Sequence, residues 1–379
     1  MRRTEGKTAG EQVLLGDPDL APKLAASLLA AAEVDRTTHG LHTWPAGLHP
    51  DAARDLVAAF PSRSVLDPFC GGGTVLIEAL AAGRRAVGRD LSSIAVRVSR
   101  LRTELPNEAL LTAIRSAARR IADVAKAGRE PPPEPIFKAV REWYAPHVLG
   151  ELEAIRQGCL GADPSIREPL LTLFSSILIK TSYRKSDTSQ QREPTDRPRG
   201  TTSVLFHKKA REYGRRITAL REVVPEGTPP SDVAFGDARD VRIGAPVDLV
   251  LTSPPYPSTY DYLPLQHLRR VWLGLREPDD DEIASRRSWR AGEKDARKRW
   301  RSDTFAWTQS AAAALAPGGH LVVVIGDGLA PGGLVDTSEP TEAAAKNAGL
   351  VAVARASVER PDFARDTMRW EHAFAFRKG

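Results

Sequence analysis

Short apolar runs alternate with longer segments of helical periodicity over much of the chain. Strands are predicted at residues 65–66, 86–90, 233–238, 247–251 and 320–327. Helices are predicted at residues 51–60, 75–82, 304–315 and 341–348. Strands that alternate with helices are typical of a parallel sheet. Because residues 350–358 and 372–377 predict a closing antiparallel pair, we expect an α/β domain whose last strand is antiparallel.

The rest of the chain follows a different pattern. Residues 93–126 predict one continuous helix, which prolines between residues 130 and 135 bring to an end. Beyond this boundary the pattern is mainly helical, with helices predicted at residues 146–160, 166–183 and 203–223. At the N-terminus, residues 1–17 are predicted to be loosely attached and residues 19–33 to form a packing helix.

A glycine-rich turn follows the first predicted strand of the sheet. The run from Asp67 to Thr74 joins that strand to a helix through three glycines, which let a ligand approach the backbone closely. It departs from the usual dinucleotide fingerprint, and Asp67 favours a positively charged group over a pyrophosphate. The next strand ends at Asp90, where a carboxylate is expected to accept hydrogen bonds from ribose hydroxyls. Together these features predict a nucleoside-containing ligand.

A second unusual turn follows the predicted strand at residues 247–251. Ser253, Pro254, Pro255 and Tyr256 come directly after this strand, and proline cannot continue a hydrogen-bonded ladder. A hydroxyl, two rigid residues and an aromatic ring are therefore expected at the carboxyl edge of the sheet, where open α/β sheets bind ligands. A proline-stiffened turn with no chemical role is the alternative.

The segment at residues 38–50 is too rich in glycine and proline for a regular element. Its three histidines raise the question of a metal site, but no acidic or cysteine partner stands at ligand spacing. A ligand-binding loop is therefore preferred, and a purely structural loop is the remaining alternative.

Composition limits the function further. The chain has 379 residues, of which 41% are hydrophobic, and a formal net charge of +6, which permits an anionic polymer as partner. Two cysteines cannot form a disulfide framework. No membrane span or secretory signal is apparent, so we expect a cytoplasmic protein.

Two basic runs stand out. Eleven Lys and Arg residues against four acids occupy residues 184–221, which favours either phosphate and base contacts, with Arg184, Lys185 and Arg192 as substrate-binding candidates, or a solvated basic face. A second run at residues 286–301 contains Trp289 and Trp300. These rings could stack on bases, but for Trp300 the buried seam of an amphipathic helix is preferred.

These motifs resemble the class I S-adenosylmethionine-dependent methyltransferases that modify an exocyclic amino group of a nucleic-acid base. The run 67–74 resembles their cofactor loop, and Thr252 to Tyr256 resembles their catalytic motif in the serine-first form of DNA cytosine-N4 enzymes. The resemblance implies a Rossmann-like, mostly parallel sheet with an antiparallel last strand and a mainly helical insertion. The implied units are an N-terminal extension (1–37), a cofactor-binding half (38–128), a target-recognition insertion (129–229) and a catalytic half (230–379).

The resemblance also implies roles for individual residues. Ser253 and the Pro254 carbonyl would orient the target amine, beside Pro255 and Tyr256, and Tyr260 and Tyr262 would line the same pocket. The implied cofactor-binding residues are Thr43, Trp44, Asp67, Pro68, Phe69, Cys70, Gly71, Gly73, Thr74, Asp90, Asp237, Ala238 and Thr252.

The activity implied is transfer of a methyl group from S-adenosylmethionine to N4 of a flipped cytosine in DNA, with no metal. The alternatives are adenine-N6 methylation of DNA, methylation of an RNA amino group, and a nucleic-acid-binding protein that keeps the methyltransferase shell without turnover. DNA is the expected partner, with RNA as the alternative, and a cognate restriction endonuclease is a candidate partner. The sequence leaves the oligomeric state open.

Overall fold

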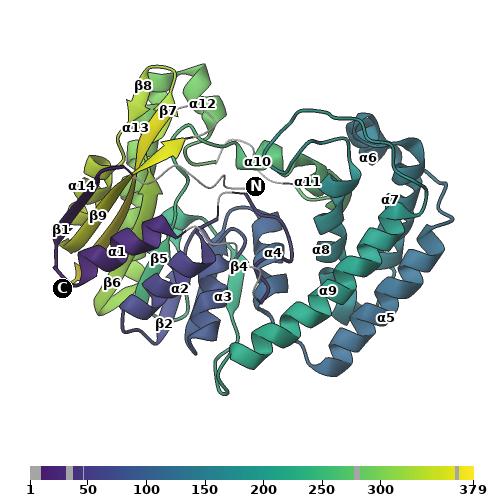
Figure 1. Ribbon diagram of the computed structural model, residues 1–379, viewed down its shortest axis with the longest axis horizontal. Helices are drawn as coiled ribbons and strands as arrows, with labels where there is room; N and C mark the ends of the chain where they lie inside the picture. The colour runs from purple at the N-terminus through teal and green to yellow at the C-terminus, as the bar shows by residue number, and fades with distance from the viewer. Residues whose placement is uncertain (1–9, 31–36, 46, 277–281, 363–366) are drawn as a thin grey trace.

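An eight-stranded sheet organises the computed structural model, which describes residues 10–30, 37–45, 47–276, 282–362 and 367–379 (Figure 1). The strand order is β1-β9-β10-β6-β5-β2-β3-β4. Adjacent strands from β6 to β4 are parallel, and β10 runs antiparallel to both β6 and β9. This is the expected Rossmann-like class I methyltransferase sheet with its antiparallel last strand. The strands are β1 (Gln12–Gly16), β2 (Ser64–Asp67), β3 (Arg85–Asp90), β4 (Asp232–Phe235), β5 (Val247–Thr252), β6 (Leu315–Gly326), β9 (Leu350–Asp362) and β10 (Thr367–Lys378).

Helices cover both faces of the sheet because its central strands are apolar on both sides. Along β5, Leu249 and Leu251 face one core and Val250 the opposite one, as strand alternation requires. The first face is covered by α1 (Leu20–Leu29), α2 (Pro50–Ala59) and α3 (Thr74–Ala81), with α4 (Ser93–Thr103) beside β3 and β4. The opposite face is covered by α12 (Arg286–Ala291), α13 (Glu293–Ala314) and α14 (Ser338–Asn347).

A separate helical layer with its own core lies beside the sheet (Figure 1). Its helices bury a continuous set of leucine, isoleucine and aromatic side chains, to which the segment after β5 also contributes Leu268 and Trp272. The members are α5 (Glu108–Ala125), α6 (Glu134–Val140), the 3₁₀ turn Arg141–Trp143, α7 (Pro146–Leu160), α8 (Pro164–Thr181), α9 (Thr201–Val223), α10 (Tyr262–Leu265) and α11 (His267–Leu273).

Two expectations about the chain's first third are corrected. The single helix expected at residues 93–126 is two helices, because Pro106 disfavours a continuous helix and the Asn107 side chain caps α5 by accepting a hydrogen bond from the Leu110 amide (2.9 Å). The expectation that residues 1–17 are loosely attached is wrong for Gln12–Gly16, which pairs with β9 as the edge strand β1. Residues 1–9 and 31–33 of the N-terminal predictions lie outside the described residues.

The basic run at residues 286–301 is helical, and its tryptophans are buried. Trp300 is 3% exposed, as expected for the seam of an amphipathic helix, and Trp289 is 1% exposed. The Arg297 guanidinium lies 5.5 Å from the centre of the Trp289 ring. These rings therefore pack in the protein core and are not available to stack on bases. The short hairpin of β7 (Gly328–Ala330) and β8 (Gly333–Val335) was not predicted.

Trp272 tests whether the helical layer contributes to the stability of the whole chain. Its fully buried ring meets Tyr144 and Phe174 edge-on, at centroid distances of 6.0 and 5.9 Å. Trp272→Ala is expected to lower the free energy of unfolding by about 3–5 kcal/mol, since it leaves a cavity that the helices cannot close. Val124→Ala, at a side chain that is 72% exposed, is the control and should change it by less than about 0.5 kcal/mol. Urea denaturation measures both, and an equal effect of the two changes would contradict this packing.

Candidate active site

One cavity opens at the carboxyl ends of β2, β3, β4 and β5, where the strand order reverses on either side of β2. Open α/β sheets bind ligands at such a reversal. The cavity brings together residues from both sequence motifs, more than 160 positions apart. The expected site residues in its lining are Trp44, Asp67, Pro68, Phe69, Cys70, Gly71, Thr74, Asp90, Asp237, Ala238, Ser253, Pro255 and Tyr262.

The glycine turn is shaped by the side chains that press against it. Gly71 and Gly73 have φ of +48° and +79°, a region that side chains disfavour. A Cβ atom at Gly71 would lie 2.7 Å from the Trp44 indole nitrogen, and one at Gly73 would lie 2.9 Å from the Ser99 hydroxyl. The turn therefore requires glycine at both positions, and Trp44 forms a wall over it.

Arg102 fixes the loop that carries Trp44 against the glycine turn. The buried guanidinium donates hydrogen bonds to the backbone oxygens of Gly72 (2.6 Å) and His42, and burial lowers the pKa of Arg102 to about 10. The Thr38 hydroxyl donates to the Arg102 carbonyl at 2.7 Å. The loop at residues 38–50 is thus attached to the turn through one side chain.

The three histidines of this loop each bond to a different part of the protein. His39 contacts the Glu78 carboxylate at 2.6 Å and His42 contacts the Ser175 hydroxyl at 2.9 Å. His49 accepts a hydrogen bond from the Asp51 amide at the start of α2. Their ring nitrogens therefore serve the packing of the loop, while Trp44 supplies its contribution to the cavity.

Asp67 is a buried acid at the base of the cavity. Its Oδ1 accepts hydrogen bonds from the Thr252 hydroxyl (2.7 Å) and the Phe69 amide (3.1 Å). Burial raises the pKa of Asp67 to about 7, and the nearby charge of Asp90 acts in the same direction. No cation among the described residues compensates an ionised Asp67, and a cationic ligand would do so.

The other two acids at strand ends are held in defined orientations. The Asp90 carboxylate accepts hydrogen bonds from the amides of Gly71 and Ser92, both at 2.8 Å. Asp237 forms a bidentate ion pair with Arg239, which keeps the pKa of Asp237 below its usual range despite partial burial. Both acids thus reach the cavity with their orientation fixed by the protein.

Only part of the motif at residues 253–256 lines the cavity. Ser253 and Pro255 lie in the cavity lining, whereas Pro254 and Tyr256 do not. The Tyr256 ring packs against Gly326, and its hydroxyl donates a hydrogen bond to the Glu371 carboxylate (2.9 Å). Loss of solvent and the Glu371 charge raise the pKa of Tyr256. The tyrosine is thus anchored to β10.

Tyr262 and Glu282 also line the cavity. The Tyr262 ring lies 5.6 Å from that of Tyr260, and burial raises the pKa of Tyr262. The buried Glu282 side chain accepts hydrogen bonds from the Tyr262 and Leu263 amides, and burial raises the pKa of Glu282 to about 7. Sequence reasoning missed Glu282, because it follows a run of three aspartates and nothing there distinguishes a buried acid from exposed ones.

The remaining expected site residues lie outside the cavity lining. Among them, Thr252 contacts Asp67, and Gly73 precedes α3 as its N-terminal cap. Arg192 forms an ion pair with Glu142 (3.5 Å) and lies 5.7 Å from the centre of the Trp143 ring. The expected site residues that do not line the cavity are Thr43, Gly73, Thr252, Pro254, Tyr256, Tyr260, Arg184, Lys185 and Arg192.

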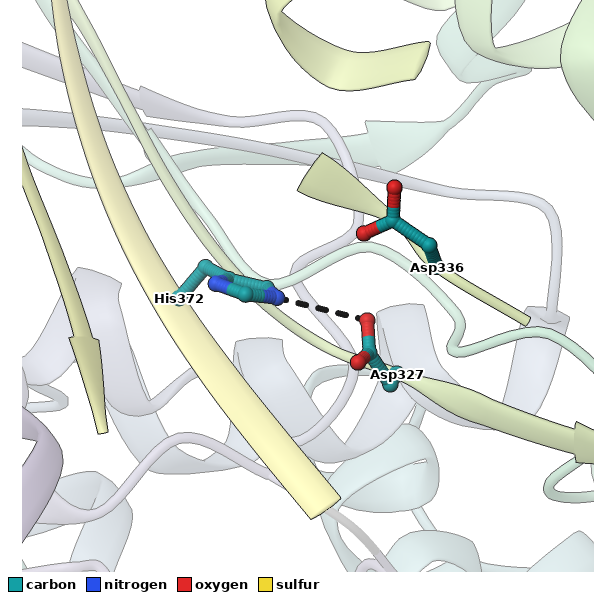
Figure 2. Close-up of side chains that lie close together, drawn as sticks. All are labelled: Asp327, Asp336 and His372. Carbon is teal, nitrogen blue, oxygen red and sulfur yellow. Dashed lines mark hydrogen bonds and ion pairs between the residues drawn. The ribbon is translucent and has the colours of Figure 1, made fainter. Parts of the chain in front are cut away.

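A second cluster of polar side chains joins β6, β10 and the start of α14. The possible ligand atoms of Asp327, Asp336 and His372 lie within 4.8 Å of one another (Figure 2). Asp327 accepts hydrogen bonds from the Thr337 amide (3.0 Å) and contacts the His372 ring (3.3 Å), while Asp336 accepts from the Ser338 amide (2.9 Å). None of the three lines the cavity, and these contacts give the cluster a role in attaching α14 to the sheet.

Comparison with known proteins agrees with this geometry. Residues 43–126, which include the glycine turn, match the family model described as "RMKL-like, methyltransferase domain". These residues are therefore similar to an S-adenosylmethionine-dependent methyltransferase domain. The residues around the cavity fit this cofactor, because Asp67 lacks compensating positive charge and the cofactor carries a sulfonium and an ammonium group.

The chain is 23% identical over 274 residues to the type II methyltransferase M.MvaI of Kocuria varians, an alignment that covers 65% of this chain and 60% of the relative. It therefore spans about three fifths of that relative's length. Among solved structures, TrmN from Thermus thermophilus is 14% identical with a TM-score of 0.34, covering 87% of this chain and 48% of TrmN. The rRNA methyltransferase AviRa from Streptomyces viridochromogenes is 14% identical with a TM-score of 0.33, covering 89% of this chain and 88% of AviRa.

No helix in the described ranges has both the length and the apolar character needed to cross a membrane.

Asp67→Asn should weaken binding of S-adenosylmethionine and remove part of its pH dependence. In the wild type, cationic cofactor groups favour ionised Asp67, so affinity should rise with pH up to about 7 and fall about tenfold per unit below it. Isothermal titration of both proteins between pH 6 and 8 measures this. Because the cofactor's own titrating groups contribute equally to both, the difference isolates Asp67. Parallel pH profiles would contradict the assignment.

The same substitution should stabilise the free protein at neutral and higher pH. The pKa of Asp67 is higher in the folded than in the unfolded chain, so its contribution to stability is greatest below about pH 4 and is lost as pH rises to about 7. An Asn Oδ1 can still accept from Thr252 and Phe69 without carrying a charge. Asp67→Asn should therefore raise the Tm at pH 8 and change it much less at pH 4, as measured by calorimetry.

Gly71→Ala should reduce cofactor affinity at least tenfold, because the new Cβ displaces Trp44 from the cavity wall. Gly227→Ala is a matched control, since Gly227 has a similar positive φ of +79° but no atom within 4 Å of the added Cβ. Both changes should cost about 1–2 kcal/mol of stability through backbone strain, but only the first should alter cofactor binding. Equal cofactor affinity in the two variants would show that Trp44 does not shape the site.

Proposed function

We propose that this protein transfers a methyl group from S-adenosylmethionine to the exocyclic N4 of cytosine in DNA. The observation that carries the proposal is that Ser253 lines the same cavity as Asp67 and Gly71. An amine held at Ser253 would therefore share one enclosed space with the bound cofactor. If the Ser253 turn and the glycine turn lay on opposite sides of the sheet, the amine and the cofactor could not meet.

Methyl transfer to this amine requires the protein to orient the nitrogen more than to supply a strong base. The lone pair of an exocyclic amine is delocalised into the ring, so the nitrogen is a poor nucleophile. The Ser253 hydroxyl and the Pro254 carbonyl would accept hydrogen bonds from its two N–H groups and favour a tetrahedral nitrogen whose lone pair points at the methyl group. The bound cofactor supplies that methyl group on a sulfonium. Ser253 is a weak base, so the proton would leave to solvent after transfer.

The tyrosines near the cavity could hold a target base that has been flipped out of the DNA stack. Tyr260 and Tyr262 form an aromatic pair, and Tyr262 lies in the cavity lining. Extruded bases are commonly held between aromatic or apolar side chains. Because Tyr256 is anchored by Glu371 outside the lining, Tyr262 is the better candidate for contact with the target base.

Two features support cytosine and DNA. The serine-first form of the motif at residues 253–256 resembles cytosine-N4 methyltransferases. The similarity to a type II methyltransferase supports a DNA substrate. Methylation of adenine N6 or of an RNA amino group remains as an outcome of the test below.

Digestion of nucleic acid after incubation with labelled cofactor identifies the product. Label is expected in N4-methyl-2′-deoxycytidine from duplex DNA, and label confined to N6-methyl-2′-deoxyadenosine or to RNA would contradict the proposal. Ser253→Ala should lower kcat by about 10²–10³-fold, the usual loss for one oriented hydrogen bond in the transition state. Its affinity for S-adenosylmethionine should stay near that of the wild type. Ser116→Ala, on the exposed face of α5, is the control and should keep full activity.

A further inference from the structure

A second pocket lies in the helical layer, at the end of α8 and in the loop that leads to α9. Four cationic side chains line it, namely Lys180, Arg184, Lys185 and Arg197. The single acid in its lining, Asp187, forms an ion pair with the buried Arg269. The pocket therefore has a strong excess of positive charge.

Arg184 is a buried cation that forms no ion pair among the described residues, and Asp187, the acid whose charge acts on it, is paired with Arg269. Only 7% of its surface is exposed, and its Nε and Nη1 donate hydrogen bonds to the carbonyl oxygens of Ser189 (2.5 Å) and Leu265 (2.7 Å). Its Nη2 is buried without a hydrogen-bond partner in the described part of the chain. Burial together with Arg269 lowers the pKa of Arg184, and Asp187 opposes this only in part. A buried cation whose charge is incompletely balanced is costly unless a ligand supplies negative charge.

Arg197, a partly exposed residue of the same lining, also has an unused donor. Its Nε is also buried and lacks a hydrogen-bond partner among the residues that the structure describes. Two guanidinium groups with unused donors thus line one pocket, and the exposed Lys180 and Lys185 add two ammonium groups at its edge. Guanidinium donors match the oxygens of a phosphate, which can accept several hydrogen bonds at once.

We propose that this pocket binds a backbone phosphate of the DNA substrate. The proposal rests on the proposed function and extends it by assigning a substrate contact outside the methyl-transfer cavity. The location favours DNA over a free phosphate, because the Leu265 carbonyl that holds Arg184 belongs to α10, the same short helix as Tyr262 of the cavity wall. Along that helix Leu265 and Tyr262 are roughly 4.5 Å apart. A phosphate bound here would therefore be close to a base held beside Tyr262.

The test measures DNA binding, so it does not depend on turnover. The variant Lys180→Ala/Lys185→Ala removes the exposed cations and leaves Arg184, which has structural hydrogen bonds, in place. The matched control Arg119→Ala/Arg120→Ala removes the same charge from the exposed face of α5. Kd for a 30-base-pair duplex is measured by fluorescence anisotropy between about 50 and 200 mM salt. Since one phosphate contact contributes about 0.9 to the slope of log K against log salt, the pocket variant should lose about one unit of slope and bind about tenfold more weakly at low salt.

Arg197→Gln is a second variant at a partly exposed position and should show a similar loss of slope. Unchanged slopes in both pocket variants, or an equal change in the control, would overturn the proposal. So would a lysine-dependent slope seen with RNA of the same sequence but not with DNA.

Inorganic phosphate tests whether the pocket binds a free phosphate ion and not a phosphate of the DNA backbone. If millimolar phosphate at constant ionic strength raises the Tm of the wild type but not of Lys180→Ala/Lys185→Ala, while the duplex slope is unchanged, the pocket binds a small phosphate and the backbone assignment is wrong. A failure of the proposed function would look different, since DNA would then remain unmethylated by the wild type whatever these slopes are.

Discussion

The hydrogen bond from the Thr252 hydroxyl to Asp67 connects the two turns that line the candidate site (2.7 Å). It depends on the parallel pairing of β2 with β5, in which Val65 and Leu66 lie opposite Leu249 and Val250. This register brings the ends of both strands to the same level, so that the glycine turn and the Ser253 turn begin side by side. A shift of one residue would turn every side chain of β5 to the opposite face of the sheet. The cavity therefore depends on this one strand pair.

The charges of the molecule are separated between its two parts. Asp67, Asp90 and Glu282 bring carboxyl groups to the cavity, and their ionised forms suit a cationic cofactor but disfavour a phosphate. The cations of the second pocket lie in the helical layer instead. The segment after β5 joins the two parts, since the Leu265 carbonyl accepts from Arg184 and the Arg269 guanidinium donates to the Ser175 carbonyl (3.2 Å). One short helical segment thus contacts both the cavity at the strand ends and the basic pocket.

Much of the sheet and of the cofactor side of the cavity could be predicted, because the signals are local. Apolar runs of strand length, followed by Asp67 or Asp90, predict acids at strand ends, and the carboxyl ends of parallel strands always share one edge. The three successive glycines likewise predict a close approach of the backbone, which the positions of Trp44 and Ser99 now account for. Pro106 and Asn107 carried an equally local signal for the break between α4 and α5, but the helical periodicity on either side outweighed it in the prediction.

The amino-acid sequence by itself determined most strands and helices of the parallel sheet, the glycine turn and the acids at strand ends, since each depends on neighbours a few residues away. Only the tertiary structure decided which charged and aromatic side chains are buried. Glu282 lies in an acidic run and Arg184 in a basic run, and both runs are typical of solvated surface. Trp289 lies in a run that equally suits a nucleic-acid contact, but it is buried. Their roles depend on elements distant in sequence, namely α10 for Glu282 and Arg184, and the sheet face for Trp289. Burial of this kind is a property of packed surfaces, and no local pattern specifies which surface a segment meets.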